Sequence, residues 1–194
     1  MDVQSSRKNS DADLYAGSVV RLASLFYDRL NEIGQFEPVS AEQLPDPYRL
    51  LLAHNAHMTV TLEAFHRSLV NVVPLAEWRD DASYARNSLL TRQADGAILQ
   101  FGIMRIWLTD LPPSARDEIT VQKLPLGRVL IEHDMLREVE LIALWKLQPG
   151  PTLRRHFRLN ADQPVYGRSA QILLNERPTV QMLEIVAVDL SNAD

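Results

Sequence analysis

Residues 84–108, YARNSLLTRQADGAILQFGIMRIWL, are the stretch that decides the fold. Two extended runs flank Asp95-Gly96, a dipeptide that favours a two-residue hairpin turn. With this turn as the loop, Arg86 and Arg105 face each other across the two strands. Like charges in such a position destabilise a sheet, so we expect an anion between the two guanidinium groups. The alternatives are that both side chains point into water, or that a longer loop shifts the register.

The rest of the chain predicts mostly helices before His66 and mostly strands after it. Helices are expected at residues 11–34, around 48–52 and at 58–65, with two short ones after Pro113 and Pro125. Strands are expected at residues 69–75, 84–92, 98–108, 139–147, 165–174 and 179–188. This order predicts an α+β fold, with a largely antiparallel sheet of about six strands and helices packed on it.

Composition narrows the class of protein. The 194 residues predict a single domain at residues 13–190 after a polar, disordered tail at residues 1–12. A net charge of -5 argues against a nucleic-acid partner. The absence of cysteine excludes disulfides, thiolate metal sites and cysteine nucleophiles, and it fits a cytoplasmic location. No apolar run approaches the ~18 residues of a membrane span, so no membrane partner is expected.

Glu184 is an acidic residue within the apolar run Met182–Val188. At a period of two it shares a strand face with other apolar residues, where an unpaired carboxylate would be costly. One interpretation is a binding or acid–base carboxylate in a lined pocket. The other is a structural partner for a nearby arginine, and position alone does not separate the two.

Two further patterns in the sequence have the composition of a binding site. His54, His57 and His66 lie close in sequence, but their spacing matches no metal-ligand pattern, so we expect no metal site. Gly127, in KLPLGRVL, opens a helix whose free backbone N–H groups could hold a carboxylate. The alternative is that these groups bind only water.

Taken together, these segments resemble the chorismate pyruvate-lyase (4-hydroxybenzoate synthase) family, as a divergent member. The resemblance runs from about Met58 to Glu184 and depends on the order and spacing of short motifs. These are Met58-Thr59, Arg86 in YARNSLL, Ala94-Asp95-Gly96, Arg105 in FGIMRIW, Leu124–Arg128, Tyr166-Gly167-Arg168 and Glu184. The part before about Asn55 has no clear match, the hairpin is longer than in the family, and Tyr166 stands where tryptophan is more familiar.

The resemblance implies a lyase that converts chorismate to 4-hydroxybenzoate and pyruvate by elimination of the enolpyruvyl group. Arg86 and Glu184 would be catalytic, with Arg86 on the ring carboxylate and Glu184 on the ring hydroxyl. Arg105 would face the enolpyruvyl carboxylate. Backbone N–H groups near Met58, Leu126 and Gly127 would complete the substrate site. Such an elimination requires no metal or redox cofactor.

Two alternatives share the same residues. The fold that the resemblance implies is also used by ligand-sensing domains of transcription regulators, so the chain could be a non-catalytic binding or sensor domain for a small aromatic carboxylate. It could also be a lyase for a related ring acid. In each case the expected partner is a small aromatic or enolpyruvyl carboxylate, and the sequence leaves the oligomeric state open.

Overall fold

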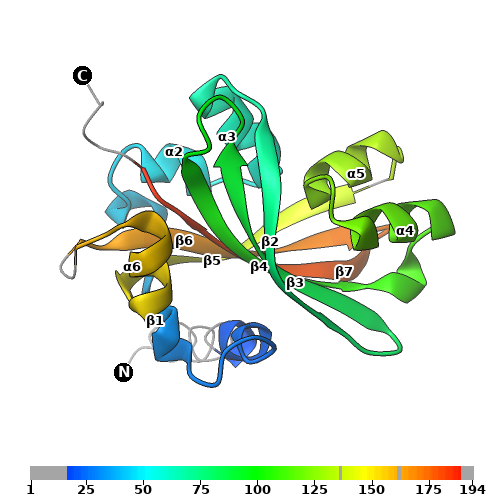
Figure 1. The fold of residues 1–194 in the computed structure, drawn as a ribbon, viewed down its shortest axis with the longest axis horizontal. Helices are drawn as coiled ribbons and strands as arrows, with labels where there is room; N and C mark the ends of the chain where they lie inside the picture. Colours follow the sequence, from blue (N-terminus) through cyan, green and yellow to red (C-terminus); the bar gives the residue numbers. More distant parts are fainter. Residues whose placement is uncertain (1–16, 136, 161–162, 189–194) are drawn as a thin grey trace, which may run out of the picture.

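The structure, a computed structural model, describes residues 17–135, 137–160 and 163–188. The expected tail and the limits of the expected domain lie outside these residues. Their centre is a seven-stranded antiparallel sheet in the order β1-β5-β6-β7-β4-β3-β2 (Figure 1). The strands are β1 (Gly34–Val39), β2 (Val70–Arg79), β3 (Ser83–Arg92), β4 (Ile98–Trp107), β5 (Arg137–Pro149), β6 (Val165–Leu174) and β7 (Arg177–Val186). The predicted α+β class with an antiparallel sheet is confirmed.

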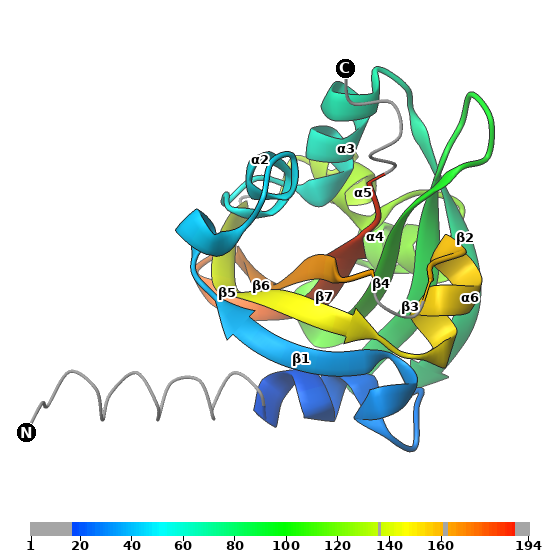
Figure 2. The same ribbon diagram turned by 90° about the vertical axis from the view of Figure 1, so that its left-hand side faces the viewer.

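Helices cover both faces of this sheet (Figures 1 and 2). One face carries α2 (Tyr48–Leu52), α3 (Met58–His66), α4 (Pro113–Val121) and α5 (Leu126–Glu132). The other carries the helical residues 17–23 and α6 (Pro151–Phe157). Because strand side chains alternate between the faces, Met104 and Met182 pack toward α4 and α5, whereas Ile103 and Leu183 pack on the opposite side. Within the described residues no helix is long and apolar enough to cross a membrane.

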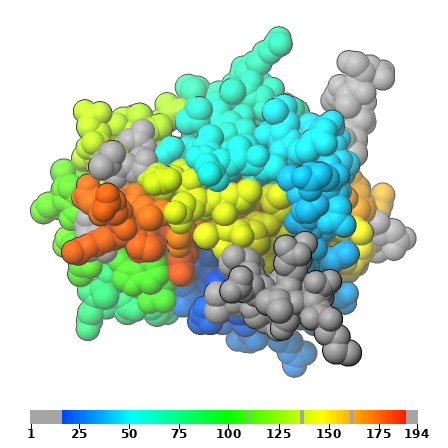
Figure 3. Space-filling view, turned by 180° about the vertical axis from the view of Figure 1, so that it is seen from behind, coloured from blue at the N-terminus to red at the C-terminus, as the bar shows by residue number. Residues whose placement is uncertain are grey.

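The segment before Tyr48 differs from the prediction of one long helix. The described α-helical residues end at residue 23, the 3-10 helix η1 (Leu30–Glu32) follows, and β1 then pairs with β5 at the edge of the sheet (Figure 2). In the space-filling view, blue atoms of the segment around β1 lie against the yellow atoms of β5 (Figure 3). Phe36 packs edge-on against the buried Trp145, with 5.9 Å between ring centroids. The expected helix therefore ends early, and Gly34, expected to cap it, is instead the first residue of β1. Pairing with β5 and packing on Trp145 hold residues 34–39 in an extended conformation. This strand is the seventh of the sheet.

The β3–β4 hairpin has a wider loop than the two residues predicted. The Arg92 N–H donates to the Ala97 carbonyl, which closes a four-residue loop over residues 93–96. Asp95 stabilises this loop, because its carboxylate pairs with Arg92 at 2.6 Å and accepts the Ala97 N–H. A bulge at Leu99 then shifts the register once more, since Thr91 pairs with Ile98 but Leu90 pairs with Gln100.

The result of the two register shifts is that Arg86 lies opposite Met104, and Arg105 lies opposite Ala85. Because directly opposed residues share a face and successive residues alternate, Arg86 and Arg105 point to opposite faces of the sheet. The predicted pairing of the two arginines is therefore wrong.

Gly150 fixes the approach of β5 to the turn before β1. A Cβ atom there would lie 2.6 Å from the Glu32 carbonyl oxygen and closer still to that of Asn31. We predict that Gly150→Ala lowers the free energy of unfolding by about 1–3 kcal/mol, as overpacking commonly does. Gly17→Ala is the control, because its Cβ would meet only the end of the Arg21 side chain, at 3.5 Å. Equal melting temperatures for both variants would contradict this account of Gly150.

Candidate functional site

A cavity of about 60 Å³ lies between the sheet and the first residues of α3 and α5. Its polar wall is one row of residues across four strands: Ser88 on β3, Gly102 on β4, Glu184 on β7 and Arg168 on β6. Strand pairing aligns these residues, and alternation turns them all toward the same helices. Gly102 has no side chain, so the row leaves a gap at its middle.

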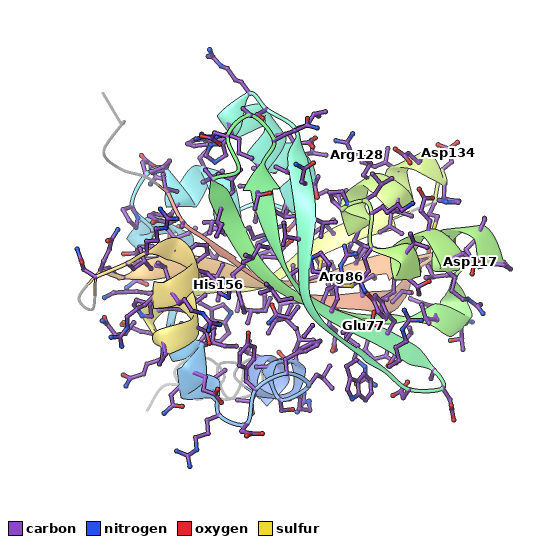
Figure 4. The ribbon with its side chains drawn as sticks, in the orientation of Figure 1. Glu77, Arg86, Asp117, Arg128, Asp134 and His156 are labelled. Atoms are coloured by element: carbon purple, nitrogen blue, oxygen red, sulfur yellow. The ribbon has the colours of Figure 1, made fainter. Side chains whose placement is uncertain are left out.

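Arg86 projects into this cavity from the neighbouring row, beside Met104 and Met182. It lies near the centre of the molecule (Figure 4) and is only 3% exposed. Its Nε and Nη1 atoms have no hydrogen-bond partner, and no carboxylate of the described residues lies within 4.0 Å of it. Burial lowers the pKa of the guanidinium, an effect that nearby Tyr84 partly opposes. Arg86 is therefore a desolvated cation whose charge is uncompensated within the fold.

Glu184 does have a partner for its charge. Its Oε2 accepts a hydrogen bond of 2.7 Å from Nε of Arg168, which is completely buried. The remaining Arg168 nitrogens donate to the backbone carbonyls of His54 at 2.8 Å and Ala56 at 3.0 Å. Arg168 thus joins β6, β7 and the connection between α2 and α3. This geometry supports the structural interpretation of Glu184, although the carboxylate also lines the cavity.

The starts of α3 and α5 form the other wall. Met58 and Leu126, the first residues of the two helices, line the cavity together with Gly127. A Cβ atom at Gly127 would lie 3.4 Å from Oγ1 of Thr59 and 3.5 Å from Nδ1 of His57, both ordinary contact distances, so the first turn of α5 packs directly on the start of α3. The structure therefore brings the predicted Met58, Leu126 and Gly127 together with Arg86 and Glu184; their binding roles stay predictions.

Arg105 lies outside the cavity. Its Nε donates to Oγ of Ser83 at 3.0 Å, and it pairs with Asp80 at 3.2 Å. The guanidinium also stacks on Trp78 and Trp107, 5.3 and 5.1 Å from the ring centroids. The prediction that Arg105 forms a second cationic wall of the site is wrong, because the loop and bulge of the hairpin turn it to the other face.

The three histidines near α3 lie in separate environments. His54 contacts Arg168, His57 lies beside Gly127, and His66 contacts Arg92 at 3.5 Å. Within the described ranges, no three histidine, aspartate or glutamate side chains are placed to hold a metal ion.

Several cavity residues were missed by reasoning from sequence. Ser88 and Met182 lie two residues from Arg86 and Glu184, so strand alternation from those positions could have found them. Gln100 could not be found in this way, because the bulge at Leu99 sets its direction. Its Oε1 is buried without a partner. Arg168 belongs to the motif Tyr166-Gly167-Arg168, but its pairing with Glu184 follows only from the pairing of β6 with β7.

Comparisons with known proteins give a likeness in structure alone. No protein-family model and no curated protein matches the sequence. The effector domain of PhnF from Mycobacterium smegmatis superposes with a TM-score of 0.52 at 10% identity, over 79% of this chain and 93% of that one. Another structure of PhnF from the same organism gives a TM-score of 0.49 at 10% identity. This match covers 68% of the present chain, which spans only 63% of the length of that PhnF chain. A third match is the ligand-binding domain of a protein from Bordetella bronchiseptica that is assigned to the GntR family of transcriptional regulators. It gives a TM-score of 0.47 at 11% identity, over 62% of this chain and 86% of that one.

The comparisons show a fold shared with the PhnF effector domain, and the α+β class with its antiparallel sheet agrees with the predicted chorismate-lyase-like fold. They also correct the functional prediction. The solved structure that shares the fold is an effector domain, and this finding contradicts the expectation of a chorismate lyase.

Breaking the buried ion pair tests the structural role of Glu184. We predict that Glu184→Gln lowers the free energy of unfolding by about 3 kcal/mol, because Arg168 keeps its charge in the interior. The melting temperature should fall by about 6–12 °C. Glu37→Gln serves as the control, since its pair with Lys146 is long at 3.6 Å and exposed. A Glu184→Gln protein as stable as this control would contradict the assignment.

His54 should make stability depend on pH. Its Nδ1 accepts the Ala56 N–H and its Nε2 lies 2.8 Å from the Leu51 carbonyl, an arrangement that fits the neutral ring. Burial, and secondarily Arg168, lower the pKa of His54 below 6.5. As the pH falls through about 6.5, the unfolded chain therefore takes up protons first, and the free energy of unfolding decreases.

We predict this decrease between pH 7 and pH 5 in denaturant titrations, and a smaller decrease in His54→Gln. Burial also lowers the pKa of His66 and His156, so part of the dependence should remain in the variant. An identical pH profile for the two proteins would rule out the contribution of His54.

Proposed function

We propose that the chain is a non-catalytic binding domain that senses a small organic anion held by Arg86. The observation that carries this proposal is the buried guanidinium with no counter-ion in the fold. Leaving a charge unpaired in the interior costs several kcal/mol, and an anionic ligand in the adjoining cavity would remove this cost. A planar guanidinium matches a carboxylate in a bidentate geometry.

The charges around the cavity support a ligand with a single negative charge. Arg86 and Arg168 contribute two positive charges and Glu184 contributes one negative charge. Arg168 already uses its hydrogen bonds within the fold, so Arg86 remains as the cation for the ligand. One carboxylate would bring the cavity to neutrality, whereas a dianionic phosphate would leave a negative charge without a partner.

The apolar lining supports an organic acid with an apolar body. Met58, Met104 and Met182 line the cavity, three of the five methionines in the chain. Methionine is flexible and polarisable, and it adapts to differently shaped apolar groups. At about 60 Å³ the cavity holds roughly four or five waters, so a ring-sized ligand requires these side chains to move. A small aromatic carboxylate fits this combination of one cation and an adaptable apolar wall.

The role as a sensor is supported by the fold. The similar solved structures are an effector domain and the ligand-binding domain of a transcriptional regulator, and we extend this kind of role to the present chain as a proposal. The cytoplasmic location expected from the absence of cysteine stays a prediction.

Isothermal titration with benzoate, 4-hydroxybenzoate and inorganic phosphate tests the function. We expect at least one of the benzoates to bind more tightly than phosphate. Arg86→Ala should weaken that binding by about 2–5 kcal/mol, a loss of about 30-fold to several thousandfold. The matched control is Arg105→Ala, an arginine at a similar position on the adjacent strand but on the opposite face.

The proposal fails if neither benzoate binds. It also fails if a folded Arg86→Ala protein binds the benzoates as tightly as Arg105→Ala does. Tighter binding of phosphate than of both benzoates would overturn the assignment to organic monoanions.

A further inference from the structure

Glu77 lies directly opposite Arg86 in the β2–β3 ladder. Such residues share a face of the sheet, with Cβ atoms roughly 5 Å apart, and both are labelled close together in Figure 4. The Glu77 carboxylate nevertheless turns away from Arg86. Its Oε2 accepts a hydrogen bond from Nε2 of Gln122 and lies 3.4 Å from Arg79. The side chain is half-exposed, so it is free to adopt another rotamer.

Tyr84 adds a second unsatisfied donor beside Arg86. It lies two residues before Arg86 on β3 and therefore shares its face of the sheet. Its hydroxyl is buried without a hydrogen-bond partner, and burial raises its pKa. The Arg86 guanidinium lowers the pKa of Tyr84 through its charge and through an interaction with the hydroxyl, whereas the charge of Glu77 raises this pKa. One carboxylate could therefore satisfy both the Arg86 guanidinium and the Tyr84 hydroxyl.

Gln122 connects Glu77 to the wall of the cavity. It caps the C-terminal end of α4 in a left-handed conformation, with φ of 61°. Pro125, three residues later, immediately precedes α5, whose first residues line the cavity. The Glu77–Gln122 hydrogen bond therefore ties the edge strand β2 to the α4–α5 connection.

We propose that Glu77 is the internal counter-ion of Arg86 and competes with the ligand for it. Without ligand, the carboxylate exchanges between Gln122, where the structure places it, and a position beside Arg86 and Tyr84. When a ligand anion occupies Arg86, the carboxylate returns to Gln122 and fixes the α4–α5 connection. This inference rests on the proposed function, because it identifies how occupancy of the same cavity is transmitted to its helical wall.

A double-mutant cycle on the protein without added ligand tests the counter-ion role. Melting temperatures are measured for the parent, Glu77→Gln, Arg86→Gln and the double variant. We expect Glu77→Gln to lower the melting temperature by about 2–4 °C in the parent and to have no such effect beside Arg86→Gln. Glu37→Gln, a carboxylate on the opposite edge strand, should have additive effects with Arg86→Gln. Additive effects of Glu77→Gln and Arg86→Gln would overturn the proposal, and Arg86→Met replaces Arg86→Gln if the latter does not fold.

Benzoate titration tests the competition. Removing the internal competitor in Glu77→Gln should raise the affinity for benzoate about fivefold. Gln122→Leu should lower it, because Glu77 then loses its alternative partner. Coupling in the cycle without benzoate binding would support the counter-ion and overturn the proposed ligand. Benzoate binding with an additive cycle, or with unchanged affinity in Glu77→Gln, would overturn the counter-ion alone.

Discussion

The ion pair between Arg168 and Glu184 is the interaction on which the rest of the site depends. Both side chains lie in the interior, so neither charge would be tolerated there without the other. Arg168 also occupies the carbonyls of His54 and Ala56, which lie just before α3. The ion pair therefore fixes the position of the start of α3 relative to the sheet. The cavity is the space between this end of α3 and the sheet.

Three arginines on the sheet illustrate how the surroundings decide the role of a charge. Arg168 is buried and fully hydrogen-bonded, which suits a structural role. Arg105 is stacked between two tryptophans and paired with an exposed aspartate. Arg86 is buried but lacks such partners, and this difference supports it as the binding residue. The sequence alone does not distinguish the roles of the three arginines, whereas their burial and their hydrogen bonds in the structure do.

The sequence predicts much of the fold because the signals are local. Prolines mark the starts of α4 and α5, and alternation marks the central strands. It also selects Glu184, since a charged residue in an apolar strand is unusual and needs an explanation. Arg86 is selected through an expected pairing with Arg105 that the structure does not show. Reasoning from the sequence fails where the exact geometry of a turn or a distant contact decides. The carboxylate of Asp95 widens the hairpin loop, the bulge at Leu99 sets the face of Gln100, and β1 forms only because β5 is there to pair with it. Arg168 becomes the partner of Glu184 because β6 and β7 are neighbours in the sheet, and a local sequence pattern does not reveal strand order.

Gly102 is a position at which a single substitution would change the size of the cavity. The floor of the cavity exists because one side chain is missing from the row between Ser88 and Glu184. An added methyl group there would press mainly on the amide end of Gln100, at 3.0 Å, while the nearest backbone atoms lie 3.9 Å away. A single-nucleotide change in a glycine codon yields alanine, so a lineage could shrink or reshape this space without rebuilding the sheet. Ligand preference could thus drift between descendants while the architecture is inherited unchanged.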